Sequence, residues 1–212
     1  TNNVVRGCDI SSNIFAGVLL RSNSFGNRVT ANEFDGANTY QDQAIRILNG
    51  DRNVVSNNRM YGNGYGVYVD GTARSNLILR NAIYSNNNSG VYITSPASRN
   101  RIISNVFEGK SGYQNEGVYV SSSHGNTIQG NFTRDHGGDG IFLTSSDTNW
   151  VVGNLIMSNN GDGVEVDWGN GFNRIDGNTI RGGMGWQDRG VYFYYARSNV
   201  VTNNIIERHS SS

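Results

Sequence analysis

Acidic side chains that could take part in proton transfer concentrate between residues 135 and 167. The candidate catalytic groups are Asp135, His136, Asp139, Asp162, Glu165 and Asp167. Carboxyl groups held close together raise one another's pKa, so a protonated acid can stand beside an ionised base. The same oxygens suit Ca²⁺, a hard cation that prefers carboxylate ligands, and Ca²⁺ is the one cofactor that this pattern suggests. The structural alternative is a solvated polar rim without chemistry.

A second set of residues could bind a sugar chain. The candidate substrate-binding residues are Arg46, Tyr68, Tyr92, Tyr119, Phe142, Arg189, Tyr192 and Tyr194. An aromatic strip that faces solvent favours a partner, here the rings of a polysaccharide, and tyrosine hydroxyls can add hydrogen bonds. Arg46 or Arg189 could neutralise the carboxylate of a uronate. The structural alternative is that the aromatic rings hold neighbouring strands together through cross-strand contacts.

These residues can form one site only if the chain brings distant segments together, and an internal repeat predicts that it does. Eight segments share a pattern of aliphatic, any and apolar residue, and they begin 22 to 27 residues apart at Gly17, Ala44, Gly66, Gly90, Gly117, Gly140, Gly163 and Gly190. The alternation is typical of a strand with one buried face. Asp139 and Asp162 each precede such a start, so we expect them to be stacked neighbours.

Asparagine pairs with an invariant separation follow each start by nine or ten residues. The pairs are Asn27/Asn32, Asn53/Asn58, Asn76/Asn81, Asn100/Asn105, Asn126/Asn131, Asn149/Asn154, Asn173/Asn178 and Asn199/Asn204. An apolar residue stands two positions after each Asn, except that Thr133 follows Asn131. We interpret Asn as the residue that adopts the left-handed backbone of a sharp corner and bonds to the same amide in the next coil. Cys8 takes an Asn position in an incomplete first coil, where we expect it to be buried.

The repeat predicts an all-β fold, a right-handed parallel β-helix of about eight coils with an Asn ladder. Each coil of 22–27 residues should contain three short strands, stacked at ~4.8 Å on those of the next coil. We expect residues 1–212 to form a single domain of this kind, or a segment of a longer solenoid. The connections 35–43, 108–116 and 181–189 should flank the first sheet, with Tyr40, Tyr113 and Trp186 closing a groove.

The segments Asn63-Gly64-Tyr65-Gly66-Val67-Tyr68-Val69 and Asn86-Asn87-Asn88-Ser89-Gly90-Val91-Tyr92-Ile93 resemble the parallel β-helix repeat family. This family includes alginate C5-epimerases, polysaccharide lyases and hydrolases, and periplasmic metal-maturation proteins. The resemblance covers essentially the whole chain and implies an extracellular or periplasmic protein. Its epimerases carry an Asp-Pro-His motif on the first strand of a coil. No coil here has that motif, and Glu165 and Asp167 take its Asp and His positions in the seventh coil.

Together these features predict a protein that processes an acidic polysaccharide along the outer face of the first parallel sheet. Epimerase- or lyase-like chemistry is the main hypothesis, and an enzyme could also be a glycoside hydrolase. The alternative is a non-catalytic carbohydrate-binding or structural module of the tailspike or adhesin type. Open strand edges at both ends would favour an end-to-end or trimeric homo-oligomer.

Other partners are disfavoured by charge and composition. The chain has equal numbers of acidic and basic residues, 17 of each, which argues against a nucleic-acid partner. No apolar run reaches the ~20 residues needed for insertion into a membrane. His124, His136 and His209 lack the spacing of a zinc or copper site.

Overall fold

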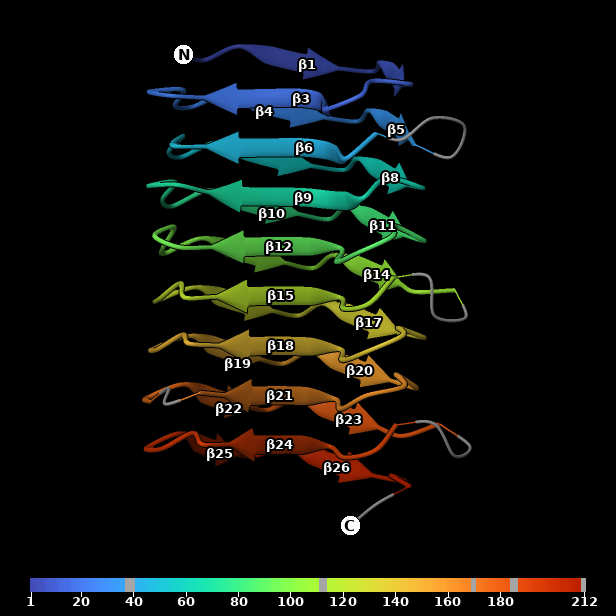
Figure 1. The fold of residues 1–212 in the computed structure, drawn as a ribbon, viewed down its shortest axis with the longest axis vertical. Coiled ribbons are helices and arrows are strands. Elements are labelled where there is room, and N and C mark those ends of the chain that lie inside the picture. Colours follow the sequence, from blue (N-terminus) through green and yellow to red (C-terminus); the bar gives the residue numbers. More distant parts are fainter. Residues whose placement is uncertain (37–40, 111–113, 169–170, 184–186, 211–212) are drawn as a thin grey trace.

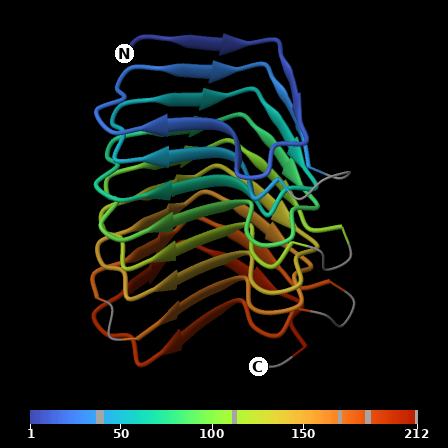
Figure 2. The same ribbon diagram turned by 45° about the horizontal axis from the view of Figure 1, so that its top comes forward.

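The computed structural model describes residues 1–36, 41–110, 114–168, 171–183 and 187–210, and it confirms the parallel β-helix. Within these described residues, twenty-six strands form three sheets of nine, nine and eight strands, called here A, B and C, and every pairing between named strands is parallel. The coils stack along one axis, with sheet C in front in Figure 1 and the first coils uppermost in Figures 1 and 2. In the described part of the chain, no helix could span a membrane.

Sheet A contains the strands that directly follow the first Asn of each Asn pair, and β1, which follows Asn3. Its strands are β1 (Val4–Arg6), β4 (Arg28–Thr30), β7 (Val54–Ser56), β10 (Leu77–Leu79), β13 (Arg101–Ile103), β16 (Thr127–Gln129), β19 (Trp150–Val152), β22 (Arg174–Asp176) and β25 (Val200–Thr202). Sheet B follows two residues later in every coil. Its strands are β2 (Asp9–Ser11), β5 (Glu33–Asp35), β8 (Arg59–Tyr61), β11 (Ala82–Tyr84), β14 (Val106–Glu108), β17 (Phe132–Arg134), β20 (Leu155–Met157), β23 (Thr179–Arg181) and β26 (Ile205–Glu207).

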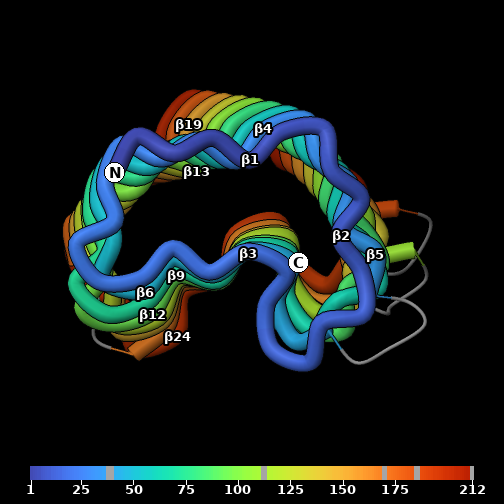
Figure 3. The backbone as a smooth tube through the Cα atoms, turned by 90° about the horizontal axis from the view of Figure 1, so that it is seen from above, coloured from blue at the N-terminus to red at the C-terminus, as the bar shows by residue number. Residues whose placement is uncertain are grey.

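Sheet C contains the strands that begin each repeat. They are β3 (Ala16–Arg21), β6 (Gln43–Leu48), β9 (Tyr65–Asp70), β12 (Val91–Thr94), β15 (Val118–Ser121), β18 (Ile141–Thr144), β21 (Val164–Asp167) and β24 (Val191–Tyr194). Seen along the axis, the three sheets enclose the interior and successive coils superimpose (Figure 3). Residues one repeat apart therefore lie side by side.

The interior is filled by the aliphatic residues that the alternation predicts. Ile78, Ile83 and Ile93, one from each sheet, are fully buried. All repeats but the one at Ala44 begin with glycine, because the chain passes close to sheet B there. At Gly140, for example, a Cβ would lie 2.5 Å from Cγ2 of Ile156.

The two predicted Asn ladders are present. Oδ1 of Asn100 accepts hydrogen bonds of 3.0 Å from both the backbone amide and the side-chain amide of Asn76, and the same pairing recurs from coil to coil. The left-handed backbone, however, belongs to the residue before each ladder Asn, such as Ser75 and Arg99. The interpretation of Asn as the left-handed residue was therefore wrong; the side chain is selected for the ladder bonds.

Cys8 takes the expected ladder position, since its backbone amide donates to Oδ1 of Asn32 at 3.0 Å. It is nevertheless exposed, contrary to the prediction that it is buried. It belongs to the first coil described, which has a neighbouring coil on one side alone. No chemical role follows from its position.

A third ladder, which the sequence analysis missed, runs along the corner between sheets B and C. Its members are Asn13, Gln41, Asn63, Asn86, Gln114, His136, Asn159, Gln187 and His209. This ladder cannot be recognised from a single residue type, because Asn, Gln and His all occur in it. Insertions also make the spacing between its members irregular. The ladder holds the corner that leads into every strand of sheet C.

Candidate functional site

A column of polar side chains runs across the starts of five neighbouring strands of sheet C, at the position just before the repeat start in each of these coils. The residues are Ser89, Glu116, Asp139, Asp162 and Arg189. Backbone bonds fix their order: the amide that follows Glu116 donates to the carbonyl of Asp139, and the pattern continues to Asp162 and Arg189. We call this set the acidic column. Asp139 and Asp162 are neighbours, as predicted from the spacing.

Three carboxylates converge in this column. The backbone amide of Asp162 donates a 2.6 Å hydrogen bond to Oδ1 of Asp139. One oxygen each of Asp139, Asp162 and Glu165 lies within 4.8 Å of the other two. Glu165 reaches the group from the outer face of β21, whereas Asp139 and Asp162 are largely buried, with 9% and 5% of their surface exposed.

Burial separates the proton affinities of these carboxylates. Desolvation is the main cause that raises the pKa of Asp139 to about 8. The backbone hydrogen bond from Asp162 lowers this pKa, whereas the charges of Glu165 and Asp162 raise it. Burial also raises the pKa of Asp162, to about 6, against the opposing charge of Arg189. The guanidinium of Arg189 lies 3.7 Å from Asp162. At neutral pH a protonated carboxyl therefore stands next to an ionised one.

Glu116 extends the acidic column, and the sequence analysis missed it. Oγ of Ser89 donates a 2.7 Å hydrogen bond to its Oε2, and burial raises its pKa. The signal was available, because Glu116 precedes Gly117 as Asp139 precedes Gly140. Because Glu116 ends the long connection 108–116, it was interpreted as part of a loop and not as the equivalent of Asp139.

The outward positions of sheet C form a second column beside the first. In register they are Leu19, Arg46, Tyr68, Tyr92, Tyr119, Phe142, Glu165 and Tyr192. The rings of Tyr92 and Tyr119 are stacked with centroids 4.8 Å apart and planes at 18°, and those of Tyr119 and Phe142 lie 5.0 Å apart at 9°. Tyr68 meets Tyr92 edge to face at 5.1 Å. We call these four rings the aromatic stack.

The aromatic stack does not offer the flat platform for sugar rings that we expected. Both faces of Tyr119 are covered by its neighbours, so its edge and hydroxyl are what can reach a ligand. Stacked rings stabilise the contact between strands by ~0.5–1.5 kcal/mol beyond their buried area. This geometry favours the structural alternative for the rings. The hydroxyl of Tyr119 is hydrogen-bonded to Ser121 of the same strand.

The two candidate arginines differ in their partners. Arg46 is bound to Asp70, with Nη2 2.5 Å from Oδ2, and packs against the rings of Phe15 and Tyr68. Its charge is therefore already balanced. Arg189 makes the longer contact with Asp162 and lies over the ring of Tyr192, 3.8 Å from the centroid. Arg189 is consequently the better placed of the two to meet a uronate carboxylate.

His136 does not join the carboxylates. It is buried in the third ladder, where Nε2 lies 2.7 Å from Oγ1 of Thr133 and Nδ1 faces Gln114 at 3.5 Å. Burial lowers its pKa to about 3, so the ring is neutral. An imidazole enclosed by the coil cannot reach a substrate, and this placement overturns its assignment as an acid or base.

Asp135 and Asp167 also stand apart from the three converging carboxylates. Asp135 occupies the corner after β17 and pairs with Arg134 at 3.6 Å. Asp167 projects from the end of β21 and is hydrogen-bonded to Thr144 of the adjacent strand, while burial raises its pKa. The structure thus brings together Asp139, Asp162 and Glu165 from the predicted set.

Tyr194 lies in a group of exposed rings at the end of β24, at the opposite end of the strands from the acidic column. It contacts Trp168 and Tyr195 at the corner after sheet C, and neither of those two was singled out from the sequence. The predicted groove-closing residues Tyr40, Tyr113 and Trp186 lie outside the described residues.

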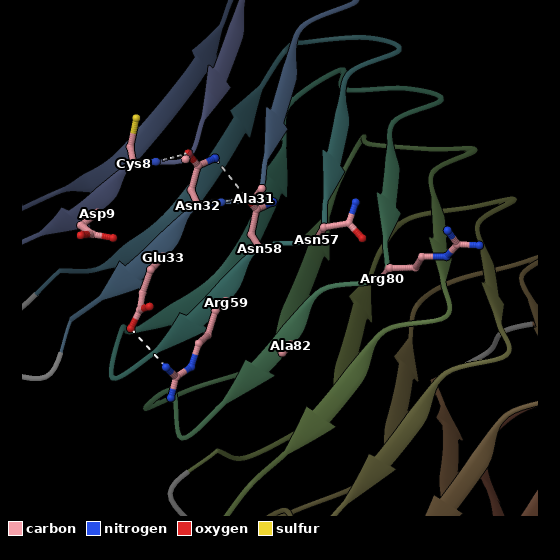
Figure 4. Close-up of a pocket in the computed structure, with 11 residues that line it drawn as sticks. Cys8, Asp9, Ala31, Asn32, Glu33, Asn57, Asn58, Arg59, Arg80 and Ala82 are labelled. Carbon is pink, nitrogen blue, oxygen red and sulfur yellow. Dashed lines mark hydrogen bonds and ion pairs between the residues drawn. The ribbon is translucent and has the colours of Figure 1, made fainter.

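A shallow depression of about 530 Å³ lies elsewhere, over the bend between sheets A and B in the first coils. Its walls include Cys8, Asp9 and Asn58, and Glu33 there pairs with Arg59 at 3.3 Å (Figure 4). The pairing balances its most prominent charges. None of the predicted site residues lines it.

Solved structures with the same architecture include polysaccharide-modifying enzymes. The mannuronan C-5 epimerase AlgE6 A-module of Azotobacter vinelandii has a TM-score of 0.77 at 20% identity, covering 95% of this chain and 57% of that one. A double mutant of the periplasmic alginate epimerase AlgG gives 0.69 at 22%, covering 81% and 38%. Tailspike protein 2 of bacteriophage CBA120 gives 0.70 at 11%, covering 94% and 35%. The chain thus spans little more than half of the first neighbour. Among curated proteins, none matches it.

A sequence model of NosD, described as a periplasmic copper-binding protein, matches residues 108–212. Copper prefers imidazole and sulfur ligands. Within the described part of that segment, His136 and His209 are held in the third ladder and His124 pairs with Asp147, so the residues present do not fit copper. The three carboxylates suit a hard cation such as Ca²⁺ by type. Arg189 already supplies positive charge beside them.

The fold and the sequence pattern agree on the family. A model described as the right-handed beta helix region matches residues 1–131, more than half of the chain. The coils in the matched region contain the two Asn ladders and the stacked strands of sheets A, B and C. The chain therefore belongs to the right-handed β-helix family.

Proposed function

We propose that this protein acts on an acidic polysaccharide, in the manner of an epimerase or lyase, at the acidic column of sheet C. The observation that carries this proposal is the meeting of Asp139, Asp162 and Glu165 within 4.8 Å, with the pKa of Asp139 raised to about 8 and that of Asp162 to about 6. Enzymes that move protons near neutral pH need such a pair of acid and base. The similarity to two alginate epimerases supports the same class of substrate.

The proposed chemistry begins with removal of the C5 proton of a uronate by an ionised carboxylate, Asp162 or Glu165. Arg189 balances the charge of the uronate carboxylate, into which the C5 electron pair is delocalised. In a lyase, the protonated carboxyl of Asp139 gives its proton to the C4 oxygen, which leaves as a C4–C5 double bond forms. In an epimerase, the carboxylates lie within 4.8 Å of one another on one side of the sugar, so water would return a proton to the opposite face of C5. The hydroxyls of Tyr92 and Tyr119 would bind neighbouring sugar units.

The location follows from the same proposal. The matched NosD model and the AlgG structure are both described as periplasmic. A polysaccharide substrate would be met outside the cytoplasm, and we therefore propose an extracellular or periplasmic protein.

Incubation with mannuronan in D₂O, followed by NMR, tests the proposal. An epimerase incorporates deuterium at C5 without cutting the chain, whereas a lyase produces unsaturated ends. Asp139→Asn and Glu165→Gln should each reduce turnover by at least 100-fold, since acid–base groups typically contribute about 10²–10⁴. Asp9→Asn, an exposed change on sheet B, is the matched control and should retain full activity. Equal turnover in all variants would contradict the proposed site.

A non-catalytic module of the tailspike type is the alternative that one observation favours. Asp139 and Asp162 are only 9% and 5% exposed, and the aromatic stack acts as a support between coils. If wild-type protein binds mannuronan in calorimetry yet neither exchanges C5 protons nor cuts the chain, the binding module is the correct reading.

A further inference from the structure

An exposed aromatic cluster lies at the corner after sheet C in the last two coils. Its rings belong to Trp168, Tyr194 and Tyr195, which are 59%, 41% and 69% exposed. Tyr195 stacks on Trp168 with ring centroids 5.6 Å apart and planes at 28°, and Tyr194 meets the indole edge to face at 5.9 Å. One indole face is therefore covered from the side of the last coil.

In the two coils before Trp168, small residues take the same corner position. Ser122, Ser145, Trp168 and Tyr195 occupy the same corner position in successive coils, because the amide of each of the first three donates to the carbonyl just before the next. All four have left-handed backbones, with φ between 48° and 57°. Their side chains therefore leave the corner in the same direction, one above another. Serine is far shorter than tryptophan, so we infer that Ser145 and Ser122 leave space beside the second face of the indole, and we call this space the notch.

We propose that this notch is a further saccharide subsite, which binds one sugar ring of the polysaccharide. A pyranose presents an apolar face of C–H groups, which packs on an aromatic face, and a rim of hydroxyls, which Ser145 and Ser122 can meet. Aromatic walls with a few placed polar groups are typical of binding sites for small polar ligands. The aromatic stack cannot provide this contact, because its rings cover one another.

The notch lies near one of the proposed catalytic groups. Trp168 follows three residues after Glu165, which corresponds to about 10 Å along an extended strand at ~3.3 Å per residue. On the next strand, Tyr192 lies beside Glu165 and Tyr194 beside Asp167, with the two tyrosine rings 6.2 Å apart, and Arg189 covers Tyr192. An oligosaccharide that crosses β21 and β24 would contact both the carboxylates and the indole. The inference rests on the proposed function and adds a subsite to it.

Calorimetric titration with mannuronan oligosaccharides of increasing length tests the subsite. Trp168→Asn should raise the Kd for a hexasaccharide by about threefold to tenfold and leave that for a disaccharide held at the carboxylates unchanged, because one aromatic contact is lost. Asparagine tolerates the left-handed backbone at this position, so the coil is preserved. Trp168→Tyr, which keeps a ring, should retain most of the affinity. Trp150→Thr removes another exposed tryptophan, on sheet A, and should change neither Kd.

The outcomes separate the subsite from the proposed function. If Trp168→Asn binds every oligosaccharide as tightly as the wild type, the subsite is wrong and the proposed function stands. If the wild type binds none of the oligosaccharides, both the proposed function and the subsite that rests on it are wrong. Ser145→Trp should fill the notch and weaken hexasaccharide binding to the level of Trp168→Asn; unchanged binding by this variant would also overturn the subsite.

Discussion

Oγ1 of Thr133 lies 2.7 Å from Nε2 of His136, inside the fifth complete coil. In the next coil the same two positions hold Ile156 and Asn159, an aliphatic residue followed by a ladder amide. The threonine that interrupts the aliphatic pattern is thus matched by a histidine that interrupts the amide pattern. The two deviations form one polar pair within an otherwise apolar layer.

This pairing predicts that the two positions are coupled. Thr133→Ile should reduce the free energy of unfolding by about 1–3 kcal/mol, because Nε2 of buried His136 loses its partner. The double change Thr133→Ile with His136→Asn reproduces the Ile156 and Asn159 arrangement and should recover most of that loss. Denaturant unfolding of the four proteins gives the coupling energy. Additive effects of the two changes would contradict the pairing.

His136 also predicts an acid-sensitive fold. Its pKa is lowered to about 3 by burial, against 6.5 in an unfolded chain, so the unfolded state binds more protons between these values. The stability that depends on the neutral ring is complete above pH 6.5 and falls as the pH drops towards 3, by up to ~1.4 kcal/mol per pH unit. His136→Asn should flatten the stability profile in this window. Identical profiles for the two proteins would exclude the effect.

Asp139 should have the opposite dependence. Because its folded pKa is raised to about 8, the folded state holds a proton that the unfolded state releases above about pH 4, and stability falls as the pH rises from 4 to 8. Asp139→Asn should therefore raise the melting temperature at pH 8 while removing activity. Melting curves across this range test the sign, with Asp9→Asn as a control. A lower melting temperature at pH 8 would show that the carboxylate is stabilised there.

Arg189 should set the pH at which Asp162 becomes a base. Its charge lowers the pKa of Asp162, so Arg189→Gln should move the acidic limb of the pH–rate profile to higher pH. Arg181→Gln is the matched control, because Arg181 pairs with Glu207 on sheet B at 2.7 Å. A profile that is lowered uniformly, without a shift, would assign Arg189 to substrate binding alone.

The aromatic stack should contribute stability that does not depend on its hydroxyls. Tyr119→Leu should lower the free energy of unfolding by about 1–2 kcal/mol through loss of two ring contacts, whereas Tyr119→Phe should leave it nearly unchanged. If the hydroxyl binds substrate, Tyr119→Phe should instead raise the KM. Unfolding and kinetic measurements on both variants separate the two roles. Equal stability of Tyr119→Leu and wild type would contradict a supporting stack.

The repeat made the fold and much of the site predictable, because equivalent positions of successive repeats are stacked, which places Asp139 over Asp162 and Tyr92 beside Tyr119. Sequence position alone could not reveal which side chains are solvated. His136 looked like a loop base and is a ladder residue, since the third ladder mixes Asn, Gln and His across insertions. Glu116 shared the position of Asp139 but followed a long connection. Which faces of the aromatic rings remain open depends on ring orientation, which no spacing encodes.

In the outward column of sheet C, the number of coils between two side chains sets the distance between them. Arg46 and Glu165 are joined by five successive coil steps, so a rise of ~4.8 Å per step fixes their separation at roughly 24 Å. Removing or duplicating one whole coil would change that length by a single increment while every remaining rung kept its partner. The separation between two binding groups of this column would therefore change in steps of one coil, while the coils that carry these groups stayed the same.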